Sequence, residues 1–209
     1  MKIRVTNSTL ALCSIGACAL SATSASAAIT GTTGQATFLA VPPPSCGPGL
    51  LTGPVAYAWD EQSNVPLNLI ANMVNNPGAS AAPIPGALIG QYDSHFIHWE
   101  WNTATFAVNG TVTFSSPIVG VDFRPLDLDA TDVYGAGGTV YPTGYPFRGL
   151  TTNPPSSFSI SGNTLSFHFN TQVPAIDIVQ LRVFTAVPAP GVAGAFAAAG
   201  LVGLRRRRR

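Results

Sequence analysis

The chain has 209 residues and a formal net charge of +1 at pH 7, with ten basic and nine acidic residues. Seven of the ten basic residues lie at the two ends, in Lys2, Arg4 and the arginines of 205–209. The segment 28–185 retains three arginines, no lysine and all nine acidic residues, a formal charge of −6. An acidic, lysine-free body excludes nucleic acid as its partner and suits divalent cations or neutral polysaccharide.

Residues 1–27 have the layout of a secretory signal peptide. Lys2 and Arg4 precede an apolar run over 10–20, and small residues follow in an Ala-x-Ala pattern that ends at Ala27. We therefore expect export through the Sec translocon, with cleavage after Ala27 or Ala28. A lipoprotein in which Cys18 carries the lipid is the alternative, and the Ala-x-Ala site favours the first interpretation.

The segment 28–185 predicts one all-β domain. Apolar residues alternate with polar ones over 106–114, and a short apolar strand is expected over 118–123. Two further alternating runs flank Gly162 and Asn163, which is typical of a hairpin with a primed turn. A last strand is expected around 179–183, whereas 65–73 fits either a strand or a short helix. An antiparallel β-sandwich of jelly-roll type accounts best for this pattern.

Three carboxylates crowd the segment 127–132, close to Asp122. Asp127, Asp129 and Asp132 could supply the oxygen ligands that calcium prefers, which makes calcium a candidate cofactor. The spacing is not that of an EF-hand, because the required glycine and the final glutamate are absent. The competing interpretation is a solvated loop or a short helix capped by Asp129.

The segment 93–101 combines histidines with tryptophans. On a strand, His95 and His98 point to opposite faces and cannot readily share an ion. His98 and Glu100 do share a face, and a zinc site there needs a third ligand, for which His168 is a candidate.

Trp99 and Trp101 share the other face of the same expected strand. We expect them to face the core. If they faced solvent instead, they would form an aromatic platform suited to stacking on sugar rings.

No catalytic motif stands out in the sequence. There is no G-x-S-x-G elbow, no H-E-x-x-H and no phosphate-binding glycine loop, and only two glutamates, Glu61 and Glu100, are present. Cys46, the only cysteine of the body, has no disulfide partner within it. We therefore expect no catalytic residues and no enzymatic activity.

The segment 186–209 has three parts. Pro188 and Pro190 keep 187–191 extended, and 192–204 is a run of 13 apolar or glycine residues. As a helix this run is ~20 Å long, short of the ~30 Å hydrocarbon core of a bilayer. The arginines at 205–209 then stay on the cytoplasmic side. We expect a short transmembrane helix that holds the chain in the membrane transiently.

This layout resembles the PEP-CTERM sorting signal of Gram-negative and related bacteria, in which an exosortase is thought to process the chain near the motif. The motif here is Val187, Pro188, Ala189, Pro190 and Gly191, with Ala189 where glutamate is commonest. The body is similar to a group of PEP-CTERM proteins without assigned catalytic residues. That similarity rests on the segments YDSHFIHWEW, NGTVTFSSPIVGV, LDATDVYGAGGTVYPTG and SISGNTLSFHFNT.

Together these observations predict an exported protein, sorted to the cell surface or extracellular matrix after transient anchoring in the inner membrane. Its expected role is structural or adhesive within an extracellular polysaccharide matrix. The alternatives are a carbohydrate-binding module, with or without calcium, and a hydrolase of matrix material.

Overall fold

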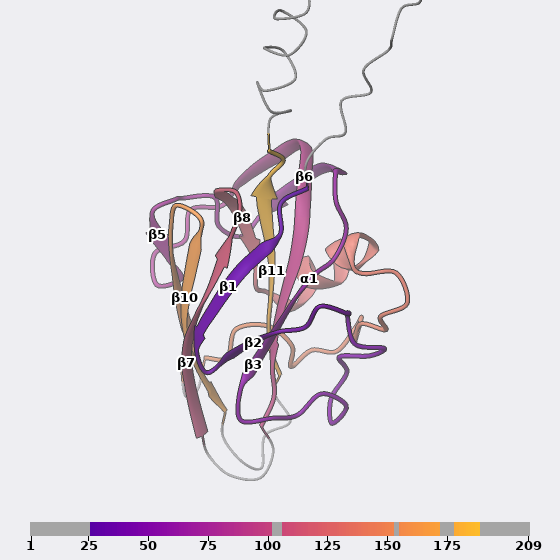
Figure 1. The fold of residues 1–209 in the computed structure, drawn as a ribbon, viewed down its shortest axis with the longest axis vertical. Coiled ribbons are helices and arrows are strands. Elements are labelled where there is room, and N and C mark those ends of the chain that lie inside the picture. Colours follow the sequence, from indigo (N-terminus) through magenta and orange to yellow (C-terminus); the bar gives the residue numbers. More distant parts are fainter. Residues whose placement is uncertain (1–25, 102–105, 153–154, 172–177, 189–209) are drawn as a thin grey trace, which may run out of the picture.

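The structure is a computed structural model, which describes residues 26–101, 106–152, 155–171 and 178–188. These residues form two packed β-sheets, a short α-helix and a 3-10 turn (Figure 1). The five-stranded sheet contains, in spatial order, β1 (Ile29–Gly34), β7 (Phe106–Phe114), β10 (Thr164–Thr171), β9 (Ser157–Ser161) and β5 (Gly78–Ala79).

The six-stranded sheet is arranged around the long strand β6 (Gly86–Trp99), which pairs with three neighbours. Its spatial order is β2 (Ala36–Phe38), β3 (Ala56–Asp60), β6, β11 (Val179–Ala186) and β8 (Ile118–Asp122), with β4 (Val65–Ala71) on the first half of β6. The strand pairs are antiparallel except for β2 and β3. The all-β, antiparallel prediction is therefore confirmed.

The main core lies between the two sheets. Val108, Val112 and Phe114 of β7 face it from one side, and Leu181 and Val183 of β11 face it from the other. Their alternation with polar residues is the period-two pattern of the sequence, because successive side chains on a strand point to opposite faces.

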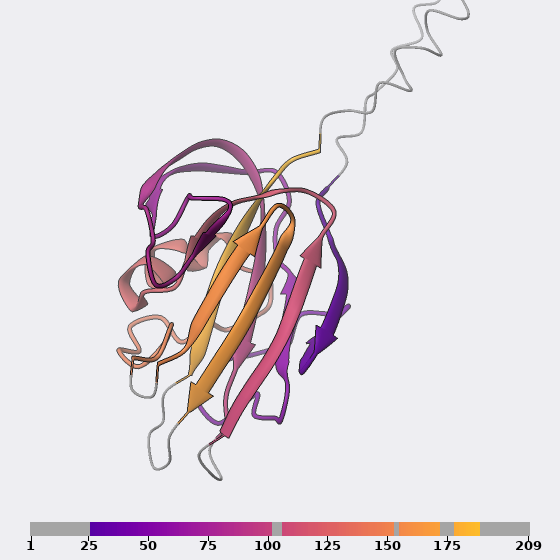
Figure 2. The same ribbon diagram turned by 90° about the vertical axis from the view of Figure 1, so that its left-hand side faces the viewer.

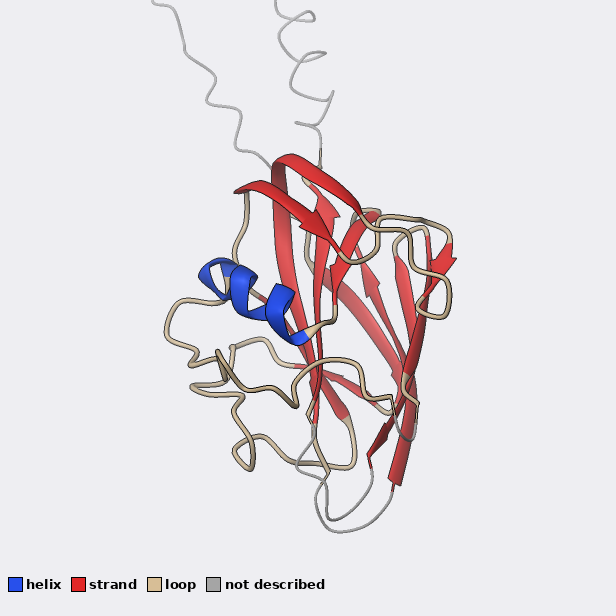
Figure 3. Cartoon of the chain, turned by 180° about the vertical axis from the view of Figure 1, so that it is seen from behind, coloured by secondary structure: helices blue, strands red, loops and turns tan. Residues whose placement is uncertain are grey.

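A third layer covers the outer face of the six-stranded sheet (Figure 3). It consists of α1 (Pro125–Thr131), the 3-10 turn η1 (Asp132–Tyr134) and the loops around them. A second apolar cluster lies beneath this layer, formed by Cys46, Trp59, Phe96, Leu128 and Ala136. Consequently β6 from Asp93 onward and β11 up to Thr185 are buried on both faces.

The outer face of the five-stranded sheet has no such cover. Figure 2 shows β7, β9 and β10 side by side with no helix in front of them. The outward residues of β9, namely Ser157, Ser159 and Ser161, are exposed. The two faces of the sandwich therefore differ: one is buried under loops and the other is open.

Most of the expected elements are present. The strands over 106–114 and 118–122 form as predicted, and 65–71 is a strand rather than a helix. The hairpin β9–β10 turns at Gly162, whose φ of +64° suits a residue without Cβ. The prediction that Asp129 caps a helix was wrong, because α1 begins at Pro125 and its N-cap residue is Arg124.

The signal-peptide segment before Ser26 and the tail from Ala189 lie outside the described residues. Within the part that is described, no helix is long and apolar enough to cross a bilayer.

Candidate functional site

The covered face of the six-stranded sheet contains a buried ionic network centred on Arg182. This side chain is fully buried, and its guanidinium packs against two aromatic rings, 4.8 Å from the centroid of Phe96 and 5.1 Å from that of Tyr141. Its Nε donates to Oε2 of Glu61 at 2.9 Å and its Nη2 to Oε1 at 3.1 Å. Tyr141 donates its hydroxyl hydrogen to the same carboxylate. Burial and the Glu61 charge both raise the pKa of Tyr141, so it stays protonated.

Two of the predicted calcium ligands are held by arginines. Arg148 donates from Nη1 to Asp129 and to Asp132, each at 2.8 Å. Arg182 also donates to Asp132, at 3.2 Å. Asp127 lies apart from them and accepts a hydrogen bond from Asn72 at 2.7 Å. The structure therefore does not bring Asp127, Asp129 and Asp132 to a common point.

His98 is buried beside this network with both ring nitrogens engaged. Its Nε2 lies 3.1 Å from the carbonyl oxygen of Leu51, and its Nδ1 lies 3.1 Å from Nε2 of Gln180. These partners specify a neutral ring that donates from Nε2 and accepts at Nδ1. Burial, together with the charge of Arg148, lowers the pKa of His98 to about 4.

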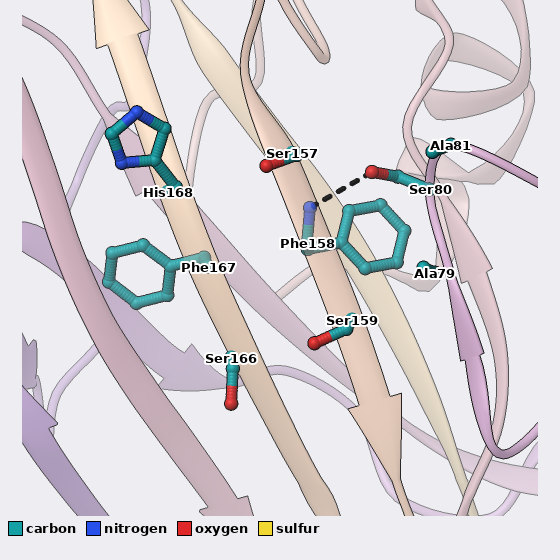
Figure 4. Close-up of a pocket in the computed structure, with 9 residues that line it drawn as sticks. All are labelled: Ala79, Ser80, Ala81, Ser157, Phe158, Ser159, Ser166, Phe167 and His168. Atoms are coloured by element: carbon teal, nitrogen blue, oxygen red, sulfur yellow. Dashed lines mark hydrogen bonds between the residues drawn. The ribbon is translucent and has the colours of Figure 1, made fainter.

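The zinc arrangement considered from the sequence does not form. His98 and Glu100 lie under the loop layer on the six-stranded sheet, whereas His168 projects from β10 of the other sheet (Figure 4). The Glu100 carboxylate instead accepts the N–H of Gly49 at 2.8 and 2.9 Å, and burial raises the pKa of Glu100. Among the described residues, no group of three or more His, Cys, Asp or Glu is placed to hold a metal ion.

Cys46 and the glutamates offer little to a reaction. Cys46 is fully buried, and burial raises the pKa of its thiol to about 12, which keeps it protonated and unreactive. Glu61 is bound to Arg182 and Glu100 to Gly49. The network thus ties the loop layer to the sheet rather than presenting a free acid and base.

The two tryptophans proposed as a sugar platform lie in different environments. Trp99 is fully buried between the sheets, and its indole N–H donates to the carbonyl of Gly53 at 3.1 Å. The core interpretation is therefore confirmed for Trp99, which offers no face to a ligand. Trp101 is half-buried and packs against Phe106, with ring centroids 5.6 Å apart.

The open face of the five-stranded sheet forms an uncharged, hydroxyl-rich surface, which we call the hydroxyl face. Its strands contain no Asp, Glu, Lys or Arg. The strand register aligns hydroxyl side chains across the sheet, in the row Thr33, Thr111, Ser166 and Ser159. Thr33 and Thr111 are hydrogen-bonded to each other at 2.7 Å.

A shallow pocket of about 400 Å³ lies on this face, beside β5. Figure 4 shows Ser157, Ser159 and His168 on its lining strands, with Ser80 on the opposite side. Ser80 is fixed because its hydroxyl accepts the N–H of Phe158 at 2.9 Å. The pocket offers hydroxyls and one imidazole, but no charged group.

The expected processing sites directly precede the first strand and directly follow the last strand of the domain. Ala27 is buried and donates its N–H to the Asp93 carboxylate, and Ala28 donates to the Ser115 hydroxyl at 3.0 Å. Val187 and Pro188 directly follow β11 and are half-buried. The remainder of the motif, 189–191, is outside the described residues.

No protein-family model matches this chain, and neither the curated proteins nor the solved structures contain a significant match.

Neither the hydroxyl face nor the buried Arg182–Glu61 pair was predicted from the sequence. The hydroxyl face was visible as the polar half of the alternation, in Asn109, Thr111 and Thr113 of β7 and in the serines of β9. The Arg182–Glu61 pair gave no sequence signal, because 121 residues separate its members.

Proposed function

We propose that this protein is an exported, surface-sorted adhesive or structural component of an extracellular polysaccharide matrix, and that it contacts neutral polysaccharide through the hydroxyl face. The observation that carries this proposal is the absence of charged residues from all strands of that sheet. All nine acidic residues of the chain lie outside those strands.

The chemistry of the hydroxyl face supports a neutral glycan. Each serine or threonine hydroxyl both donates and accepts, as does each sugar hydroxyl. An uncharged surface also avoids the desolvation penalty that a charged group would incur on contact. Several weak contacts spread over one face suit adhesion to a repeating polymer, because avidity multiplies small affinities.

The architecture and the tail support the export part of the proposal. We infer a jelly-roll-like arrangement, since the chain passes between the sheets from β6 to β7, from β7 to β8, from β8 to β9 and from β10 to β11. The three-part tail at 186–209 supports processing by an exosortase-type enzyme near 187–191.

A carbohydrate-binding module is the second candidate, favoured by the pocket beside β5, where His168 and Ser80 lie on opposite sides. Such a module recognises a defined oligosaccharide, so a soluble oligosaccharide should compete with the polymer. A purely adhesive surface should be displaced only by long chains.

The test is co-sedimentation of the full chain with insoluble neutral polysaccharides. We expect binding that is nearly independent of salt between low and high ionic strength, because no charges contribute. Replacing Ser159 and Ser166 together by glutamate places two charges at the centre of the face and should abolish sedimentation.

A control variant places a new charge on the other sheet. Gln91→Glu, on an exposed position of β6 in the other sheet, should leave sedimentation unchanged. Binding that survives the Ser159→Glu/Ser166→Glu change, or that falls steeply with salt, would remove the hydroxyl face from the proposal.

A further inference from the structure

Asp122 is a buried carboxylate with one unsatisfied oxygen. It ends β8, is fully buried, and lies opposite Arg182 in the register of β8 and β11. Its Oδ1 accepts the backbone N–H of Asn72 at 3.0 Å. Its Oδ2 has no hydrogen-bond partner in the described part of the chain. Such an oxygen is costly to bury unless something compensates its charge.

Asn72 joins this carboxylate to a second one. Its side-chain Nδ2 donates to Oδ2 of Asp127 at 2.7 Å. Its Oδ1 accepts the backbone N–H groups of Phe123 and Arg124, at 2.9 and 3.0 Å. These four hydrogen bonds fix the backbone and side chain of Asn72. Asn72 therefore holds both Asp122 and Asp127 in place.

Both aspartates line one pocket. It has a volume of about 250 Å³ and lies between β4 and the α1–η1 segment, with Asn68, Ile70, Thr131 and Tyr134 among its other lining residues. The Thr131 hydroxyl already has hydrogen-bond partners, because it donates to the Asp127 carbonyl at 2.8 Å and accepts from Arg182 at 2.8 Å. The buried side-chain oxygen without a described partner in this pocket is Oδ2 of Asp122.

The neighbouring arginines donate their described hydrogen bonds to other carboxylates. Arg182 donates to Glu61 and Asp132, and Arg148 donates to Asp129 and Asp132. Those three carboxylates already exceed the two guanidinium groups. Arg124, the remaining arginine of the domain, is exposed and lies over the ring of Phe123. Asp122 and Asp127 add two more negative charges to a region that is already acidic.

We propose that Asp122 and Asp127 bind one hard divalent cation in this pocket, with Asn72 orienting both carboxylates. Carboxylate oxygens completed by water suit calcium, magnesium or manganese rather than zinc. The site differs from the Asp127, Asp129 and Asp132 set, because two of those residues are bound to Arg148. It is also independent of the hydroxyl face, which belongs to the other sheet.

The test is thermal unfolding of the full chain after chelation, with and without added calcium, magnesium or manganese. A cation that binds only the native state should raise the melting temperature by about 5–10 °C at 100-fold excess over its Kd. We expect this rise to be lost in Asp122→Asn and in Asp127→Asn, each compared with its own chelated state. Asp127 is only half-buried, so the second variant gives the answer if the first does not fold.

Terbium gives a direct readout, since Tyr134 lines the pocket and can sensitise its luminescence. The signal should fall in Tyr134→Phe and be displaced by calcium. Asp129→Asn is the matched control and should keep both the luminescence and the thermal shift. Loss of binding in Asp129→Asn alone would place the cation at the arginine-bound carboxylates and overturn the proposal.

Absence of any cation effect would also overturn the proposal.

Discussion

Arg182 and Glu61 form a two-point ion pair, with Nε to Oε2 at 2.9 Å and Nη2 to Oε1 at 3.1 Å. Both side chains are completely buried. Glu61 directly follows β3, Arg182 lies on β11, and Asp132 reaches the same guanidinium from η1. The pair therefore joins the six-stranded sheet to the layer that covers it.

Replacing Arg182 by methionine should destabilise the domain by about 3–5 kcal/mol, because Glu61 would remain buried without its counter-charge. Equilibrium unfolding in urea measures this difference. Arg124→Met is the matched control and should change the free energy of unfolding by less than about 0.5 kcal/mol, since Arg124 is exposed.

The double variant Arg182→Met/Glu61→Gln distinguishes the energetic contribution of the ion pair from a simple loss of packing. It should be less destabilised than the sum of the single changes, because the glutamine leaves no uncompensated charge. Additive effects would mean that the two residues contribute independently.

His98 should make the domain less stable in mild acid. Its pKa in the native state is about 4, below the ordinary value of 6.5, because the ring is buried. Between these two pH values the unfolded chain binds the proton and the native chain does not. Stability is thus fully present above pH 6.5 and is lost as the pH falls toward 4, by roughly 3 kcal/mol in total.

The measurement is the difference between the pH profiles of the wild type and His98→Gln. Glutamine offers a donor for Leu51 or an acceptor for Gln180 but does not titrate. Glu100, whose raised pKa gives a slope of opposite sign, is present in both proteins and cancels. Parallel profiles between pH 4 and 6.5 would contradict the assignment.

The sequence predicted the strands of the sandwich correctly when one face of the strand is polar and the other apolar. In β7 the buried Val108 and Val112 alternate with Asn109 and Thr111, and that alternation is the physical signature of a half-exposed sheet. In β11 the same alternation places Gln180 and Arg182 on the face that points away from the main core, and a third layer buries them there. Nothing local in the sequence reports that loops will cover a polar face.

The acidic segment 127–132 likewise shows that local sequence does not reveal the partners of a side chain. Asp127, Asp129 and Asp132 are close in sequence, but a short helix points them in different directions, toward Asn72 on one side and Arg148 on the other. The partners that decide the role of each carboxylate come from residues distant in the chain. The oxygen that is left unsatisfied belongs to Asp122, which sequence spacing alone did not single out.

Gly149 should tolerate alanine far less than Gly138 does. Both have left-handed backbones, with φ of +101° and +92°, so each change incurs backbone strain of ~1–3 kcal/mol. A Cβ at Gly149 would lie 2.4 Å from the carbonyl oxygen of Phe123, whereas one at Gly138 meets nothing within 4 Å. That carbonyl accepts the N–H of Leu150, so moving it weakens the bond as well.

We therefore expect Gly149→Ala to be less stable than Gly138→Ala by a further ~1–3 kcal/mol in urea unfolding. Equal losses in the two variants would show that strain at positive φ accounts for the whole effect.

The sorting proposal predicts that the arginine cluster is absent from protein at the cell surface. Arg182 is the last basic residue before 205–209, so trypsin should yield the peptide 183–205 from an unprocessed chain. Processing near Pro188 should replace it by a shorter peptide that begins at Val183 and ends near 187–191. Mass spectrometry of surface-extracted protein should therefore find no peptide containing Leu204, while the membrane fraction should retain 183–205 from the precursor. A Pro188→Ala/Pro190→Ala variant should accumulate the precursor, and an intact 183–205 peptide from the cell exterior would contradict sorting.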